Sequence, residues 1–182
     1  MTGTAKALRN TFRLIDDILS IDNPSFKDHV ASPAPDDLAG DEVGGIYPRQ
    51  LSLNETTISC REVHFLGMEV KDIGGQLVLD LFDNRREFTF KVIRYPHMDS
   101  VIPTNIPYGV FIGLLFRRYR ICSRLDSFVN QACDVATTLV KQGCAKKRLN
   151  RLFGTFLLKL SPLRWKTPIW NIYRRFTRRM GN

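Results

Sequence analysis

The sequence predicts an α+β fold, in which antiparallel β-hairpins come first and a bundle of helices follows. The chain has 182 residues, 43% of them hydrophobic, which is enough for one ordinary domain or two small ones with a real core. Its first half contains short apolar runs that are separated by turn-forming residues, as in hairpins. In its second half, apolar residues recur at the three-and-four spacing of amphipathic helices.

The first hairpin is expected at residues 12–21, where two apolar runs meet at the adjacent carboxylates Asp16 and Asp17. Two short strands joined by a tight turn would hold both side chains at the hairpin tip. Carboxylates in that position can share a Mg²⁺ ion with the phosphates of a substrate. For the two residues alone, a solvated turn between strands is the simpler interpretation, because Asp is common in turns.

A loop and further strands are expected in the rest of the first half. Residues 31–45 are rich in Pro, Gly and Asp, which predicts a loop. The pattern of polar and apolar side chains predicts strands at residues 50–54, 64–70, 76–82 and 88–95. The turn formers in residues 72–75 predict that the second and third of these strands pair as a hairpin.

Three amphipathic helices are expected after residue 105. Pro107 begins a segment whose first turns are apolar on nearly every side, so these turns should be buried. Ser123 is the expected N-cap of the second helix, and Gly143 is expected to end it. The third helix is expected to start at Lys146.

The sequence of the tail, residues 161–182, predicts a short basic helix. Thr167 can cap it, with Pro168 at its first position, and Trp170 lies near its start. Such a helix can pack on the bundle, lie on an anionic membrane, carry a nuclear-import signal or extend a nucleic-acid surface. The sequence leaves these alternatives open.

Positive charge is concentrated in the second half, although the net charge of the whole chain is +9. Residues 1–104 contain 11 Lys and Arg against 16 Asp and Glu, a net charge of −5. Residues 105–182 contain 16 Lys and Arg against 2 Asp, a net charge of +14. This asymmetry predicts a polyanionic partner for the second half, nucleic acid first and an anionic membrane second.

The candidate nucleic-acid-binding residues belong to two basic clusters. One lies at the start of the third helix, where the helix dipole disfavours cations unless an anion such as a phosphate offsets them. A solvated charged turn is the alternative interpretation. The other cluster lies near the end of the first helix and contributes only if its members face the same side. The candidates are Arg117, Arg118, Arg120, Lys146, Lys147, Arg148 and Arg151.

Several kinds of site are absent from the sequence. It has no Gly-rich phosphate loop, no Gly-x-Ser-x-Gly elbow and no His-Glu-x-x-His motif, which argues against P-loop enzymes and hydrolases. Its four cysteines include no Cys-x-x-Cys pair and predict neither zinc nor disulfides. The longest apolar stretch, residues 110–116, is too short for a transmembrane segment. We therefore expect an intracellular protein, with the nucleus as a plausible location.

Two motifs resemble elements of reverse transcriptases. Residues 15–19, Ile-Asp-Asp-Ile-Leu, look like the catalytic palm motif, often Tyr-x-Asp-Asp, and Phe65-Leu66-Gly67 resembles the element that helps to position the primer end. Their order and spacing, with later runs at residues 95–97, 121–123 and 139–143, are similar to eukaryotic retroelement reverse transcriptases such as the Penelope-like group.

The resemblance implies part of a polymerase palm in residues 1–104, a helical thumb in residues 105–160, and a separate tail. It implies that Asp16 and Asp17 are catalytic residues that bind Mg²⁺. The implied partners are an RNA/DNA template–primer and, for a complete enzyme, deoxynucleotides. It predicts no oligomeric state.

The chain departs from the family pattern in two ways. The family has a further catalytic Asp well upstream, whereas only 15 residues precede Asp16. We therefore expect Mg²⁺ binding only where an upstream Asp completes the site, and no DNA synthesis by this chain alone. Leu14 stands where the family usually has Tyr. A degenerate copy, one exon and a truncated reading frame remain open, as does a non-enzymatic nucleic-acid-binding or membrane-surface protein in which the two Asp occupy a turn.

Overall fold

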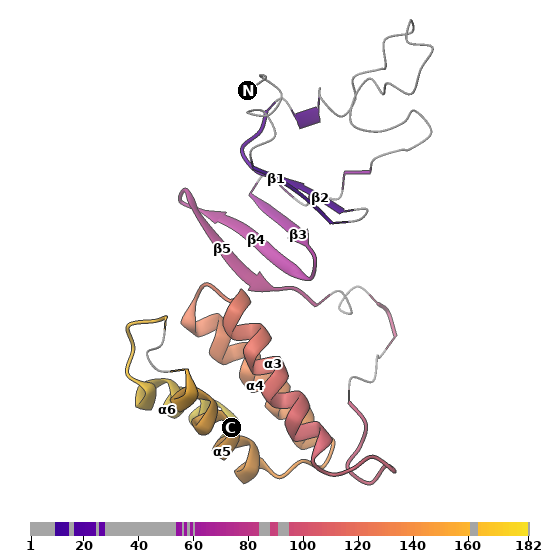
Figure 1. The fold of residues 1–182 in the computed structure, drawn as a ribbon, viewed down its shortest axis with the longest axis vertical. Coiled ribbons are helices and arrows are strands. Elements are labelled where there is room, and N and C mark those ends of the chain that lie inside the picture. The colour runs from indigo at the N-terminus through magenta and orange to yellow at the C-terminus, as the bar shows by residue number, and fades with distance from the viewer. Residues whose placement is uncertain are drawn as a thin grey trace, which may run out of the picture. The chain divides into compact units, whose positions relative to one another are not determined.

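The computed structural model divides the chain into two compact units, residues 1–66 and 67–182. It describes residues 10–14, 17–24, 26–27, 54–55, 57, 59, 61–83, 88–90, 95–160 and 164–181. Within these residues the fold is α+β, as predicted: antiparallel hairpins precede four helices, labelled α3 to α6 (Figure 1). No described helix is both long and apolar enough to cross a membrane.

The predicted hairpin in the first unit is confirmed. Strands β1 (Thr11–Leu14) and β2 (Asp17–Ser20) pair antiparallel, with Thr11 opposite Ser20 and Leu14 opposite Asp17. The hydroxyls of Thr11 and Ser20 are 3.0 Å apart and join the open end of the hairpin. A third strand, β3 (Glu62–Phe65), lies later in this unit. The predicted loop at 31–45 and nearly all of the predicted strand at 50–54 lie outside the described residues.

The second unit begins with the other predicted hairpin, but the single strand predicted at residues 64–70 is wrong, because the positive φ values of Leu66 and Gly67 form a turn between β3 and the strand that starts at Met68. Strands β4 (Met68–Ile73) and β5 (Gln76–Leu81) pair antiparallel in register from Met68–Leu81 to Ile73–Gln76. Gly74 and Gly75 form the turn with φ of 62° and 79°, the left-handed pair that a type I′ turn requires. The Gly75 N–H donates to the Asp72 carboxylate at 2.8 Å, which further stabilises the turn.

The strand predicted at residues 88–95 is wrong for the part that the structure describes. Residues 89–90 form a bend, and neither Phe88 nor Tyr95 is in a strand. The rings of Phe88 and Phe90 stack on each other, with centroids 5.2 Å apart, and are 52% and 65% exposed. The apolar side chains at these alternate positions therefore do not pack against a core. Without packing partners, an alternating sequence has little preference for the strand conformation.

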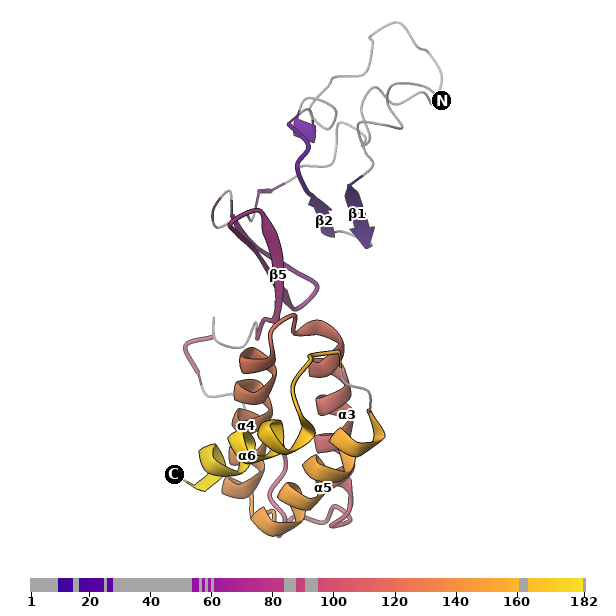
Figure 2. The ribbon, with the colours of Figure 1, turned by 90° about the vertical axis from the view of Figure 1, so that its left-hand side faces the viewer.

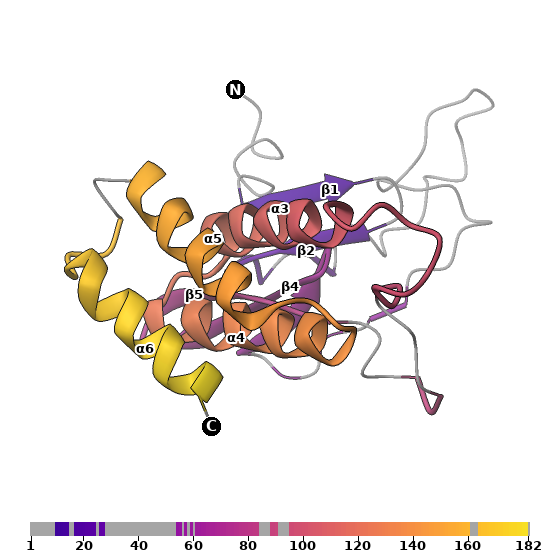
Figure 3. The same cartoon turned by 90° about the horizontal axis from the view of Figure 1, so that it is seen from below.

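Four helices follow the hairpin: α3 (Ile106–Ile121), α4 (Leu125–Lys141), α5 (Lys146–Lys159) and α6 (Ile169–Gly181). Helix α3 packs on α4 and α5, and α6 closes the bundle against the same two helices (Figures 2 and 3). Gly143, with φ of 91°, follows the end of α4 as predicted. The Pro168 carbonyl accepts the first N–H bonds of α6, so this helix starts one residue later than predicted.

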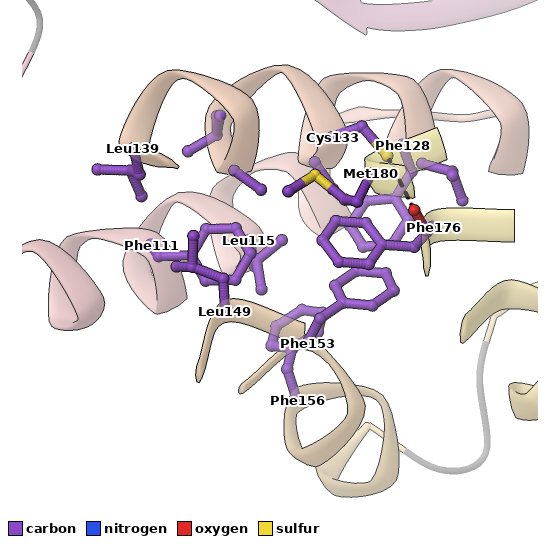
Figure 4. Close-up of a cluster of buried hydrophobic side chains, with 14 of the residues drawn as sticks. Phe111, Leu115, Phe128, Cys133, Leu139, Leu149, Phe153, Phe156, Phe176 and Met180 are labelled. Carbon is purple, nitrogen blue, oxygen red and sulfur yellow. Dashed lines mark hydrogen bonds between the residues drawn. The ribbon is translucent and has the colours of Figure 1, made fainter. Parts of the chain in front are cut away.

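Aromatic rings fill the centre of the bundle (Figure 4). Phe153 of α5 and Phe176 of α6 are fully buried and stack with their centroids 3.9 Å apart. Ile172 and Met180 are buried on the same side of α6. The apolar face of the tail helix is therefore part of the core, as the packing alternative for the tail predicted.

The N-cap predicted at Ser123 is wrong, because this residue bonds to the hairpin. The N-cap of α4 is Arg124. The Ser123 N–H donates to the Leu79 carbonyl at 2.8 Å, and the Leu79 N–H donates to the Ser123 hydroxyl at 2.9 Å. The indole N–H of Trp165 donates to the Ser123 carbonyl at 3.1 Å. Ser123 thus joins strand β5, the α3–α4 connection and the segment before α6.

The carboxylate of Asp80, the next residue of β5, makes the same connection with side chains. It accepts hydrogen bonds from the Ser127 hydroxyl and the Gln131 amide of α4. The Leu81 N–H donates to it at 2.7 Å, and the Cys122 thiol lies at 3.4 Å. A half-buried carboxylate that accepts this many hydrogen bonds fixes the hairpin to the start of α4.

We expect Asp80→Ala to lower the free energy of unfolding by about 2–3 kcal/mol, because it leaves the Ser127 and Gln131 donors without their acceptor. Urea unfolding monitored by circular dichroism measures the change. Asp72→Ala is the matched control in the same hairpin and should cost about 1 kcal/mol or less, since one exposed hydrogen bond is lost. Equal effects of the two substitutions would contradict the role given to Asp80.

Candidate nucleic-acid interface

The predicted catalytic pair is only partly described. Asp17 is the exposed first residue of β2, opposite Leu14, and Asp16 lies outside the described residues. The hairpin context of the motif is therefore confirmed, whereas the geometry of the two carboxylates stays a prediction. Glu62 and His64, two residues apart on one side of β3, are further oxygen and nitrogen donors in this unit. Two side chains alone do not define a metal site.

The primer-grip-like motif lies at a tight turn. Phe65 ends β3, and Leu66 and Gly67 have φ of 52° and 71°. A Cβ atom on Gly67 would lie 3.2 Å from the Nη2 atom of Arg117 on α3. Gly67 is therefore favoured both by its positive φ and by the close approach of a guanidinium group. This contact brings one predicted primer-positioning residue next to one predicted phosphate-binding residue.

The three arginines near the end of α3 do not share a side. Arg117 and Arg120 are exposed, but Arg118 is only 4% exposed and its guanidinium donates to the Leu114 carbonyl at 3.1 Å. The buried Arg118 guanidinium thus forms a hydrogen bond within its own helix. Arg117 and Arg120 remain available to an anionic ligand.

The basic cluster of α5 lies at the surface. Lys146, Lys147, Arg148 and Arg151 are all exposed, and the last three project away from the buried face of the helix. The Arg148 guanidinium lies 4.0 Å from the centroid of the Tyr108 ring. Arg148 therefore also stabilises the bundle through a cation–π contact. Helix α5 contains no Asp or Glu, so none of its own side chains neutralises this cluster.

A second basic surface, which the sequence analysis did not assign, lies between α4 and α6. Arg175 forms an ion pair with Asp126 at 2.7 Å, and Arg179 donates to the Asn130 side chain. A shallow groove here is lined by Asp126, Val129, Asn130, Arg175, Arg178 and Arg179. The spacing of four between the paired residues on each helix is the sequence signal that could have indicated this contact.

The charges of the helical region leave a strongly positive surface. Its two acidic residues are Asp126, which is paired with Arg175, and the exposed Asp134. The basic residues outnumber them by 16 to 2. An unneutralised surface of one sign attracts polyanions and speeds their association.

The described thiols do not form a metal site or a nucleophile. Cys122, Cys133 and Cys144 are free and buried. Burial raises the pKa of Cys133 to about 12. Burial and the neighbouring Asp80 carboxylate raise the pKa of Cys122 to about 12. Both thiols are therefore protonated at neutral pH and unreactive.

We expect these thiols to make the protein less stable at alkaline pH. Their folded pKa values lie above the ordinary value, so the stabilisation is complete below about pH 9 and is lost as the pH rises towards 12. Ionisation of each thiol in the unfolded chain should lower the free energy of unfolding by up to about 2 kcal/mol between about pH 9 and 10.5. Urea unfolding across this range compares the wild type with Cys122→Ala/Cys133→Ala, in which the fall should be smaller. Parallel pH profiles would contradict the assignment.

The chain matches no family model, no curated protein and no solved structure. The function of the basic surface is therefore inferred from its own residues and contacts.

Proposed function

We propose that the chain binds nucleic acid through the phosphate backbone, with helices α3 to α6 acting as the thumb of a reverse-transcriptase-like protein on an RNA/DNA template–primer. The observation that carries this proposal is the basic surface of α5, where Lys146, Lys147 and Arg151 are exposed and the helix has no carboxylate. Phosphate contacts by Lys and Arg supply most of the affinity of such interfaces.

The positions of these side chains support binding to an extended anion. Lys147 and Arg151 are four residues apart, so they are neighbours on one side of α5. Lys146 lies in the first turn, where backbone N–H groups add to the attraction of an anion. Several such contacts along one helix suit a phosphate chain better than a single small anion.

The packing of α6 argues against a membrane as the ligand. An amphipathic helix binds a bilayer by inserting its apolar face. In α6 that face, with Ile172, Phe176 and Met180, is buried in the bundle core. Membrane insertion of α6 would therefore require the core to open, whereas phosphate binding leaves the fold unchanged.

The reverse-transcriptase part of the proposal relies on the sequence motifs. The antiparallel pairing of β1 with β2, in which Leu14 lies opposite Asp17, supports a hairpin setting for this motif. The approach of Arg117 to Gly67 places a cation beside the primer-grip-like turn. On this proposal Asp16 and Asp17 would bind Mg²⁺ where a further carboxylate completes the site.

Binding to an RNA/DNA hybrid should weaken steeply with salt. For about six to ten phosphate contacts, affinity should fall by about 10³ to 10⁵ between about 50 and 200 mM salt. Fluorescence anisotropy of a labelled hybrid measures this dependence. An affinity that does not change with salt would contradict the proposal.

The double substitution Lys147→Ala/Arg151→Ala should reduce the slope of log affinity against log salt by about 2, because two phosphate contacts are lost. Lys71→Ala is a matched control in the same unit, since Lys71 is on β4 and forms an ion pair with Glu69 at 3.0 Å. It should leave the slope unchanged. An equal reduction in both variants would show that the effect comes from total charge and not from the α5 surface.

The metal part of the proposal has a separate test. Replacing both residues, Asp16→Asn and Asp17→Asn, should abolish Mg²⁺-dependent chemical-shift changes at the β1–β2 hairpin, because amides bind Mg²⁺ more weakly than carboxylates. Hybrid binding through α5 should persist in this variant. Identical Mg²⁺ responses before and after the substitution would favour the interpretation of the pair as a turn.

A further inference from the structure

Helix α6 carries a large aromatic side chain that the core does not use. Trp170 is 66% exposed, whereas the apolar face of the same helix is buried. Its ring stacks on that of Tyr173, with centroids 6.1 Å apart and planes inclined by 28°. Trp is favoured at binding surfaces because its ring offers a large area at a small cost in conformational entropy.

Tyr173 holds this pair firmly against the neighbouring helix. A Cβ atom on Gly154 of α5 would lie 3.3 Å from the Tyr173 ring, so the ring lies close to the α5 backbone. A larger residue at position 154 would push the ring away. Stacking on Tyr173 thus orients the Trp170 ring before any ligand binds, which lowers the conformational entropy that is lost on binding.

Basic and apolar side chains lie on the turns of α5 and α6 next to the ring pair. Helices α5 and α6 pack together and run in roughly opposite directions (Figures 2 and 3). Leu158, which is 68% exposed, lies one turn beyond Gly154 towards the Trp170 end, and Arg151 lies nearly one turn on the other side. Arg174, next to Tyr173, is exposed. Neither helix contains Asp or Glu.

We propose that Trp170 stacks on an unpaired base of single-stranded nucleic acid, while Arg174 and Arg151 bind phosphates of the same strand. This inference rests on the proposed nucleic-acid binding and adds a preference for unpaired nucleotides. Proteins that bind single strands combine a cationic surface with exposed aromatic rings, because every base has a π face. The site therefore recognises unpaired bases with little sequence preference.

The test compares two probes of equal charge. One is an oligothymidylate of about 12 nucleotides, and the other is an abasic strand of the same length. The wild type should bind the oligothymidylate more tightly. Trp170→Ala should weaken that binding by about 5- to 150-fold and leave abasic-strand binding unchanged. Oligothymidylate should also quench the tryptophan fluorescence of the wild type more than that of Trp170→Phe, which retains only Trp165.

Phe90→Ala is the matched control, because Phe90 is 65% exposed and also stacks on a neighbouring ring. It should bind the oligothymidylate like the wild type, and thermal unfolding should show that both variants are folded. An equal loss in both variants would overturn the inference, since the effect would then not be specific to α6.

Other outcomes separate this inference from the proposed function. If both probes bind equally and Trp170→Ala changes neither, phosphate binding stands and base stacking is overturned. If neither probe binds and the RNA/DNA hybrid does not bind either, both proposals fail. If Trp170→Ala weakens binding to phosphatidylserine vesicles and not to oligothymidylate, the ring contacts lipid and the inference is overturned.

Discussion

The second unit depends on the hydrogen bonds between strand β5 and the start of α4. Leu79 and Ser123 exchange two hydrogen bonds, and the Asp80 carboxylate accepts from Ser127 and Gln131. These bonds join segments more than forty residues apart in the chain. Trp165 donates to the same residue, Ser123, and so brings the segment before α6 to the same point. Polar groups this close to the core are costly when left unpaired, so the network strongly favours one arrangement of hairpin and helices.

The arrangement that results separates apolar and charged residues. The aromatic core takes up the apolar faces of all four helices, including that of α6. Most of the cations lie on the surface, with Arg118 as a buried exception that bonds to its own helix. Because the helical region has only two carboxylates, packing leaves a positive surface that other groups hardly neutralise. The charge of the sequence and the geometry of the bundle together explain why a polyanion is the expected ligand.

The surface combines three features that suit nucleic acid: a basic face on α5, the approach of Arg117 to the Gly67 turn, and an exposed tryptophan on α6. The two cationic features suit phosphates, and the aromatic ring suits a base. The two proposals together, phosphate binding and base stacking, would suit a template–primer, in which an unpaired template continues beyond the duplex. The β1–β2 hairpin belongs to the other unit and includes Asp17, one of the two residues proposed to bind Mg²⁺.

The sequence by itself determined the local elements, because they depend on periodicity and turn chemistry. Pro107 and the apolar run after it predicted α3, the three-and-four spacing predicted α4 and α5, and Gly74-Gly75 predicted the β4–β5 hairpin. Only the tertiary structure decided which side chains meet across the chain. It gave Ser123 a partner in β5, buried Arg118, and left the Phe88–Phe90 pair without a sheet. It also made Asp80 a central acceptor, although no local pattern distinguishes this residue. The physical reason is that burial and hydrogen-bond partners come from distant segments, whose positions depend on the packing of the whole unit.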